Sequence, residues 1–286
     1  MLFLSHSAHD RAPAEDVRRR LLDRGYHAAQ LFLDCDAESG IEAGDKWDDA
    51  LYGALRQCRA LIALCSMPWQ QSKWCFAELV CAKAMGKAVF PVVLEPCDLG
   101  AVAGAHQVVD VAGEGEAAYA RLWSALERQH LGPRDAWRPD PEERSLSRDV
   151  VTAFRAAIAT AEEWRSGFVG VPHLLAGLSA VADGVLSGFL RRHAIPPDAW
   201  QETLRKTIKQ LPFDGRLELT EGLMDVFRGA QESVISIRPE VNERALLRSI
   251  FEIRGPYLER LTVKAGIPLN ELRPEVMFKV TPEDDW

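Results

Sequence analysis

The residues best suited to chemistry lie in the segment SKWCFAEL, which spans Ser72–Leu79. Trp74 and Glu78 are four residues apart, so a helix places both on one face. A carboxylate beside an indole at the mouth of a cleft is partly desolvated, which tends to raise its pKa. Perturbed carboxylates of this kind are typical of functional sites. Glu78 is therefore a candidate functional carboxylate, and a solvated helix residue without a function is the alternative.

The other candidate site residues carry hydroxyl groups or aromatic rings and lie near the predicted strands and helices. Ligands of open parallel sheets bind beyond the carboxyl ends of the strands, where the strand order reverses. The residues expected to bind a ligand there are Ser5, His6, Phe32, Trp47, Ser66, Ser72 and Trp74. A purely structural role is the alternative for His6 and for the three aromatic residues.

The elements that must position these residues alternate between strand and helix over residues 1–130. Strands are predicted at Met1–Ser5, Ala28–Asp34, Arg59–Cys65, Ala88–Leu94 and Gln107–Val111, and helices at Pro13–Arg24, Trp47–Gln57, Ser72–Met85 and Glu116–His130. Continuous apolar strands between helices indicate a parallel sheet that is covered on both faces. The fold class is therefore α/β, a flavodoxin-like doubly wound domain with a five-stranded parallel sheet.

Composition and charge exclude several classes of protein. Apolar residues make up 47% and charged residues 27%, which is typical of a globular chain rather than a disordered one. The formal net charge is -8, whereas nucleic-acid binders usually carry a basic patch. The longest apolar stretch, Ala88–Leu94, is far shorter than the ~20 residues that cross a bilayer. With no targeting segment recognised, we expect a cytoplasmic protein with neither a nucleic-acid nor a membrane partner.

Metal and nucleotide-binding motifs are also missing. All six cysteines lie in the first 97 residues without CxxC spacing, so we expect buried thiols and no metal site. The acidic loop Cys35–Lys46 lacks the spacing of a calcium loop. Neither GxGxxG nor a Walker lysine is present, which disfavours dehydrogenases and P-loop nucleotidases.

Three segments in order resemble a TIR domain over residues 1–130: LFLSHSAHD, then FLDCDAESGIEAGDKW, then SKWCFAEL. This resemblance implies one of two functions, because some TIR domains cleave NAD at the nicotinamide–ribose bond and others only assemble. In the NAD-cleaving members a glutamate ends the WCxxE pattern, which corresponds to Glu78. The loop Cys35–Lys46 corresponds to a family loop that commonly mediates self-association.

The chemistry of NAD cleavage is compatible with these residues. Nicotinamide leaves from a cationic ring, so its departure needs no general acid, and a nearby carboxylate stabilises the oxocarbenium-like transition state. Trp74 or Trp47 could stack on a flat ring of the substrate. Ser5, His6 and Ser66 could hydrogen-bond to phosphate or ribose. NAD is then the substrate, and no cofactor is expected.

The second half of the chain is predicted to be helical and to contain a repeat. A proline-rich linker is expected at residues 131–145, followed by a helical domain over 146–286. FRAA at Phe154–Ala157 matches FRGA at Phe227–Ala230, and LLAGL at Leu174–Leu178 matches LLRSI at Leu246–Ile250. We expect two copies, at about 146–210 and 219–280, that pack into a single core.

This helical half resembles the N-terminal domain of Clp-type chaperones, which contains two copies of a four-helix repeat. The segment VPHLLAGL carries the resemblance, although Ala245 replaces His173 in the second copy. Such domains bind proteins in the chaperones, which implies a protein or peptide partner here. A packing unit that merely spaces or dimerises the first domain is the alternative.

The combination predicts an NAD glycohydrolase that is activated by self-association or by a ligand of the helical domain, as in an effector of bacterial defence. A non-catalytic TIR scaffold is the alternative, and a cyclising or base-exchange enzyme would share the same site. The sequence does not distinguish linear from cyclic ADP-ribose as product, and it identifies neither the trigger nor the oligomeric state.

Overall fold

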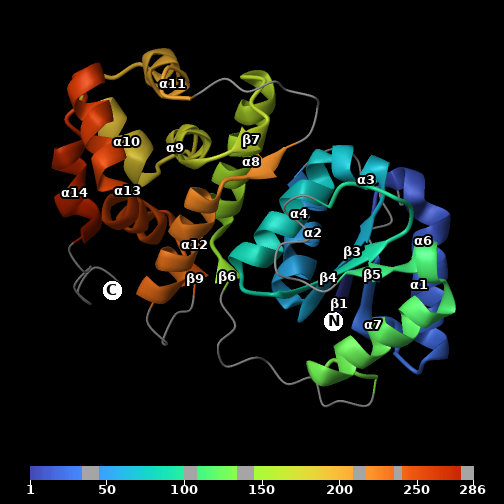
Figure 1. Ribbon diagram of the computed structural model, residues 1–286. Coiled ribbons are helices and arrows are strands. Elements are labelled where there is room, and N and C mark those ends of the chain that lie inside the picture. Colours follow the sequence, from blue (N-terminus) through green and yellow to red (C-terminus); the bar gives the residue numbers. More distant parts are fainter. Residues whose placement is uncertain (34–44, 100–107, 134–144, 209–216, 235–239, 278–286) are drawn as a thin grey trace. The chain divides into compact units, whose positions relative to one another are not determined.

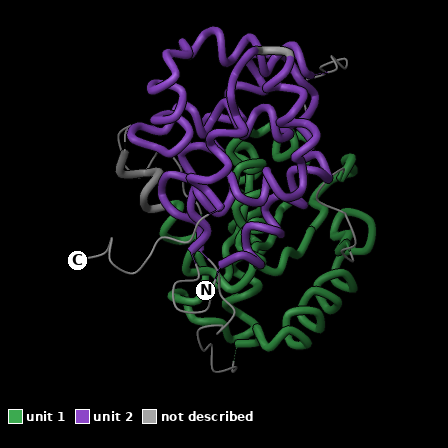
Figure 2. Tube along the Cα trace, turned by 90° about the vertical axis from the view of Figure 1, so that its left-hand side faces the viewer, with its two compact units in different colours: residues 1–143 green, residues 144–286 purple. Residues whose placement is uncertain are grey.

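The computed structural model describes residues 1–33, 45–99, 108–133, 145–208, 217–234 and 240–277, without the side chains of 45–50 and 264–265. The chain divides into two compact units, residues 1–143 and 144–286, which are coloured separately in Figure 2. Most of the expected linker, residues 134–144, lies outside the described part of the chain. Each unit has its own buried apolar side chains, such as Phe3 in the first and Phe154 in the second.

The first unit contains a parallel sheet of five strands in the described residues. The strands are β1 (Leu2–Ser5), β2 (Leu31–Leu33), β3 (Ala60–Cys65), β4 (Ala88–Val93) and β5 (Val109–Asp110). Their order is β2-β1-β3-β4-β5, and every neighbouring pair is parallel. This confirms the flavodoxin-like doubly wound sheet. The strand order reverses between β1 and β3.

Helices cover both faces of this sheet (Figure 1). The helices α1 (Arg11–Asp23) and α7 (Glu116–Arg128) pack on one face, where Leu4, Ile62 and Leu122 belong to one fully buried core. The helix α4 (Lys73–Ala84) packs on β1, β3 and β4, and α2 (Asp45–Gln57) contacts α4. Apolar burial on both faces explains why these strands are continuously hydrophobic.

Three short helical segments in the described part of the first unit differ from the prediction. Residues Ala28–Gln30 form a 3-10 turn rather than the start of β2, because the Gln30 side chain accepts the backbone N–H of His27 at 2.8 Å. A short helix, α3 (Met67–Gln71), follows β3, where no helix was expected. Another, α6 (Val111–Glu114), precedes α7.

In its described residues, the second unit is helical with two short strand pairs. Its elements are β6 (Ser145–Leu146), α8 (Arg148–Glu163), β7 (Phe168–Val169), α9 (Val171–Ser179), α10 (Val185–Arg192), α11 (Pro197–Arg205), β8 (Glu218–Leu219), α12 (Glu221–Ser233), β9 (Glu240–Val241), α13 (Glu243–Ala265) and α14 (Leu269–Met277). The backbone of α13 is non-helical at Arg254, two residues before Pro256. The two parts of α13 therefore correspond to α9 and α10, as the repeat in the sequence implies.

The strand pairs join the two copies to each other. β6 pairs with β9, and β7 pairs with β8, so each ribbon takes one strand from each copy. The equivalent rings Phe154 and Phe227 meet edge to face, with centroids 5.7 Å apart. The two copies therefore share one core.

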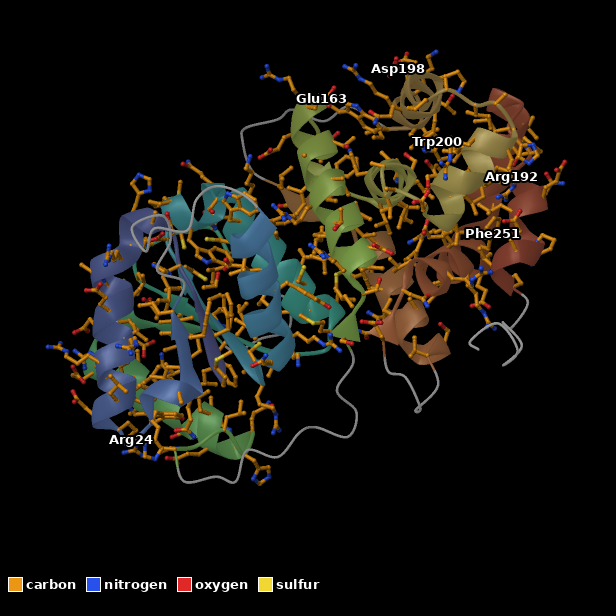
Figure 3. All side chains as sticks on the ribbon, turned by 180° about the vertical axis from the view of Figure 1, so that it is seen from behind. Arg24, Glu163, Arg192, Asp198, Trp200 and Phe251 are labelled. Carbon is orange, nitrogen blue, oxygen red and sulfur yellow. The ribbon has the colours of Figure 1, made fainter. Side chains whose placement is uncertain are left out.

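Close helix contacts complete this core. A Cβ atom on Gly177 of α9 would lie 1.9 Å from the carbonyl oxygen of Ala153 in α8. At the equivalent crossing, the Ser249 hydroxyl donates to the carbonyl of Val226 at 2.8 Å. Trp200, labelled in Figure 3, is fully buried. The helices α8 and α9 thus approach each other more closely than a larger side chain permits.

Candidate functional site

The carboxyl ends of β1 and β3 lie side by side at the point where the strand order reverses. β1 pairs with β2 on one side and with β3 on the other. Ser5 is the last residue of β1, and Ser66 follows β3 directly. Ligands of open parallel sheets bind at this edge. Both serines that were predicted to bind a ligand therefore lie at the expected edge.

The Ser66 hydroxyl is used by the protein itself. Its oxygen accepts the backbone N–H of Trp69 at 3.0 Å and so caps α3. Its proton is donated to Oδ2 of Asp10 over 2.5 Å. Ser66 and Asp10 are 1% and 8% exposed. Because a hydroxyl has a single proton, Ser66 has none left to donate to phosphate or ribose while it binds Asp10.

Trp69 connects α3 to the end of β1. Its indole Nε1 donates to the Ser5 hydroxyl oxygen at 3.0 Å, and both side chains are buried. Neither Trp69 nor Asp10 was predicted from the sequence. A signal for the helix that carries Trp69 was present, since Ser66 and Pro68 form a cap and a first-turn proline. Asp10 had no comparable signal, because its partner is 56 residues away.

The first turn of α4 is attached to the loop that follows β1. The Ser72 hydroxyl accepts the backbone N–H of Cys75 at 3.3 Å and caps the helix. The Cys75 thiol donates to the backbone carbonyl of His6 at 3.3 Å. His6 is 9% exposed. Two predicted site residues, Ser72 and His6, are therefore brought together through Cys75.

Glu78 is buried on α4, with an exposed fraction of 2%. It lies three residues after Cys75, so the two side chains share the helix face that is directed to the end of β1. α4 contacts β1 and β3, the two strands at which the order reverses. A carboxylate is rarely buried unless it has partners or a function, because burial disfavours its charged form. Glu78 is therefore a buried carboxylate on the helix that contacts both of these strands.

Trp74 differs from Glu78 in exposure, although it lies one turn earlier on the helix. Its side chain is 38% exposed, which makes it one of the few large apolar side chains on the described surface. The Lys73 amine lies 5.9 Å from the centre of the Trp74 ring, within the range of a cation–π contact. An exposed indole at this edge can stack on a ligand ring or on a partner protein.

The remaining predicted residues lie on or beyond β2. Phe32 is half-buried and stacks on Phe3, with ring centroids 4.9 Å apart, so part of its ring belongs to the core. Trp47 lies in α2, but its side chain is outside the described part of the structure. The same holds for most of the loop Cys35–Lys46, since residues 34–44 are not described.

Two of the described cysteines of this unit, Cys65 and Cys97, are poor nucleophiles. Burial raises the pKa of the Cys65 thiol far above its usual range. Burial and the carboxylates Glu95, Asp98 and Asp10 raise the pKa of the Cys97 thiol. Both groups therefore remain neutral thiols at physiological pH, whereas the thiolate is the reactive form.

The described residues contain neither a metal-binding cluster nor a membrane-spanning helix. No group of three or more His, Cys, Asp or Glu side chains in this part of the chain could hold a metal ion. No helix within the described ranges is long and apolar enough to span a bilayer.

Comparisons with known proteins give a family match for part of the chain. A family model described as a TIR domain matches residues 2–123. A search of the curated proteins finds no match.

Solved structures that match this chain include N-terminal domains of Clp and Hsp104 chaperones. One is that of the caseinolytic protease-associated chaperone ClpD from Arabidopsis thaliana, at 18% identity and a TM-score of 0.38, covering 46% of this chain and 94% of that one. Another is that of Hsp104 from Candida albicans, at 12% identity and a TM-score of 0.37, covering 46% and 89%. Residues 2–123 of this chain are therefore a TIR domain.

Proposed function

We propose that the TIR domain is an NAD glycohydrolase in which Glu78 is the catalytic residue. The observation that supports this most is the 2% exposed carboxylate of Glu78 on the helix that contacts both β1 and β3. A carboxylate held in a low-dielectric environment interacts strongly with a developing positive charge. The cleavage of NAD develops such a charge on the ribose.

The reaction that we propose breaks the bond between nicotinamide nitrogen and ribose carbon. The electron pair of this bond goes to the nicotinamide ring, which leaves as a neutral molecule. Glu78 stabilises the oxocarbenium-like ribose, and a water molecule adds to it and releases a proton. The products are nicotinamide and ADP-ribose. If a group of the substrate itself attacks instead of water, the product is cyclic ADP-ribose.

The burial of Glu78 also supports control by association. Glu78 is 2% exposed, so little of its side chain is open to a substrate in this structure. We propose that self-association of the TIR domain, or a protein or peptide bound by the helical unit, opens this site. An enzyme that depletes NAD only on demand would suit an effector of bacterial defence, acting in the cytoplasm with NAD as substrate and with no cofactor.

The exposed Trp74 favours a second candidate, a TIR scaffold without catalysis. Large aromatic side chains are common at the centres of protein interfaces. Trp74 is 38% exposed, so it is available for such a contact while Glu78 is not. In this case the two units would only bind partners, and NAD would not be consumed.

NAD consumption by the full chain distinguishes these candidates. We would measure nicotinamide release by dilute and by crowded protein, and separate linear from cyclic ADP-ribose by chromatography. The variant Glu78→Gln should lower kcat at least ~100-fold, because it removes the charge that stabilises the transition state. The control Glu127→Gln changes an exposed residue that pairs with Arg24 on another face, and its activity should equal that of the wild type.

The two variants make the outcomes distinct. Equal NAD turnover in Glu78→Gln and in the wild type refutes the role of Glu78. Absence of turnover at every concentration favours the scaffold, and Trp74→Ala should then weaken self-association.

A further inference from the structure

Four buried residues at the edge of the sheet where the strand order reverses are linked by hydrogen bonds and by the chain between Ser5 and Asp10, and we call this set the ring. Ser5 ends β1, Asp10 lies in the 3-10 turn Ala8–Asp10, Ser66 follows β3, and Trp69 lies in α3. Each is at most 8% exposed. The ring runs from Asp10 to Ser66, to Trp69, to Ser5, and back to Asp10 along the chain.

We propose that this ring positions the start of α4 and thereby the carboxylate of Glu78. The proposal rests on the proposed function for its kinetic consequence, but not for its structural one. Asp10, Ser66 and Trp69 are then positioning residues, since none of them needs to touch the substrate.

The hydrogen-bond directions in the ring permit only one arrangement. The Asp10 carboxylate can only accept, so Ser66 donates its proton over 2.5 Å. Ser66 oxygen then accepts the Trp69 backbone N–H, and Ser5 oxygen accepts the indole N–H, each at 3.0 Å. The ends of β1 and β3 are thus joined by a fixed set of donors and acceptors. A bond to a carboxylate is stronger than one between neutral groups.

The ring extends into α4 through the backbone. The N–H of Ser72 donates to the carbonyl of Trp69 at 3.2 Å. Ser72 then caps α4, and the N–H of Phe76 donates to its carbonyl at 3.0 Å. Cys75, in the same turn, bonds the carbonyl of His6 just after Ser5. Asp10 is therefore connected to the first turn of α4 by hydrogen bonds and by the backbone of Trp69 and Ser72, and Glu78 follows in the next turn.

Two conservative variants open the ring at different points. Asp10→Asn removes the charge but keeps the shape of the side chain. Trp69→Phe removes the indole N–H and keeps an aromatic ring, so the fold should tolerate it even if Asp10→Asn fails to fold. The matched controls are Asp23→Asn, at an exposed aspartate of α1, and Trp123→Phe, at a half-buried tryptophan of α7.

The structural consequence is measured by amide hydrogen exchange of the full chain. Opening the ring should speed exchange of the Cys75 and Phe76 amides ~10-fold, the effect of losing one buried hydrogen bond. Amides of α7 should be unchanged, and both controls should match the wild type at α4. Unchanged exchange at Cys75 and Phe76 in both ring variants overturns the proposal.

The kinetic consequence is a split between kcat and KM for NAD. A displaced catalytic group costs up to ~100-fold in rate, so each ring variant should lower kcat by ~10–100-fold and change KM less than ~3-fold. The double variant Asp10→Asn/Trp69→Phe should be no slower than the slower single variant, because both act through one ring. The proposed positioning role would be contradicted if the fold-losses in kcat of the two single variants multiplied in the double variant. A rise in KM without a fall in kcat would contradict it as well.

The two readouts separate this proposal from the proposed function. Faster exchange at α4 in a chain without NAD turnover refutes the glycohydrolase and supports the ring as a positioning device. Turnover with unchanged exchange and unchanged kcat in the ring variants supports the glycohydrolase and overturns the ring.

Discussion

His173 should make the stability of the helical unit depend on pH. Its imidazole is fully buried, and its Nδ1 accepts the backbone N–H of Gly170 at 3.1 Å. Nε2 therefore carries the proton and donates to the Ser166 hydroxyl at 3.1 Å. Trp164 and Phe168 pack on the ring, with centroids 5.3 and 5.6 Å away. A second proton on Nδ1 would face the N–H of Gly170, so the folded protein favours neutral histidine.

The size of the effect follows from the pKa of His173. Burial lowers this pKa from its ordinary 6.5 to about 4. The native state thus binds this proton more weakly than the unfolded chain does, and the difference corresponds to about 3 kcal/mol at ~1.4 kcal/mol per pKa unit. The stabilisation is complete above pH 6.5 and is lost as the pH falls through about 4. Between pH 6.5 and 5 the loss is about 2 kcal/mol.

Native-state hydrogen exchange of the full chain measures this loss. Peptides of α8 and α9 should lose about 2 kcal/mol of protection between pH 6.5 and 5, after correction for intrinsic exchange. The variant His173→Gln cannot titrate and should lack this part of the pH dependence. His193→Gln, in the same unit beside Glu271, should retain it. An imidazole NMR titration of His173 with a midpoint near its ordinary value would refute the reasoning.

Two further substitutions test packing and hydrogen bonding. Gly177→Ala should destabilise the helical unit by about 3 kcal/mol, because the new Cβ would meet the Ala153 carbonyl at 1.9 Å. The control Gly255→Ala has open space around its new Cβ and should change the stability by less than ~1 kcal/mol. Denaturant-dependent hydrogen exchange of the two variants measures both changes. Tyr26→Phe should lower the free energy of unfolding of the TIR domain by about 1 kcal/mol, because the buried hydroxyl donates to the Leu131 carbonyl at 2.8 Å. Equal protection of the TIR amides from hydrogen exchange in the variant and the wild type would contradict this.

The sheet of the TIR domain could be predicted because its signals are local. Runs such as RALIALC are apolar at nearly every position, and glycines end the helices between them, with Gly25 and Gly86 at φ of +104° and +70°. These features require only the neighbouring residues. The prediction of a strand at Ala28–Gln30 was wrong, because the Gln30 side chain accepts a hydrogen bond from the backbone N–H of His27.

The repeat in the helical unit also shows which features local sequence patterns predict and which they do not. Equivalent sequence segments predicted two copies, but not that each short strand pairs across the copies. His173 accepts the N–H that begins α9, whereas in the second copy Ala245 is bonded by the side chain of Asn242 at 2.9 Å. The equivalent helix starts are therefore stabilised by two different side chains, a difference that only the hydrogen bonds reveal.

The sequence by itself determined the α/β and helical halves, the order of the five strands and of the longer helices of the TIR domain, and the segment that contains Glu78. Only the tertiary structure decided that Glu78 is buried while Trp74 is exposed, and that Ser66 is bonded to Asp10 and Ser5 to Trp69. The physical reason is the distance along the chain over which each kind of interaction acts. Apolar periodicity acts over a few residues, whereas these hydrogen bonds join groups 56 and 64 residues apart that meet only when β1 and β3 pair.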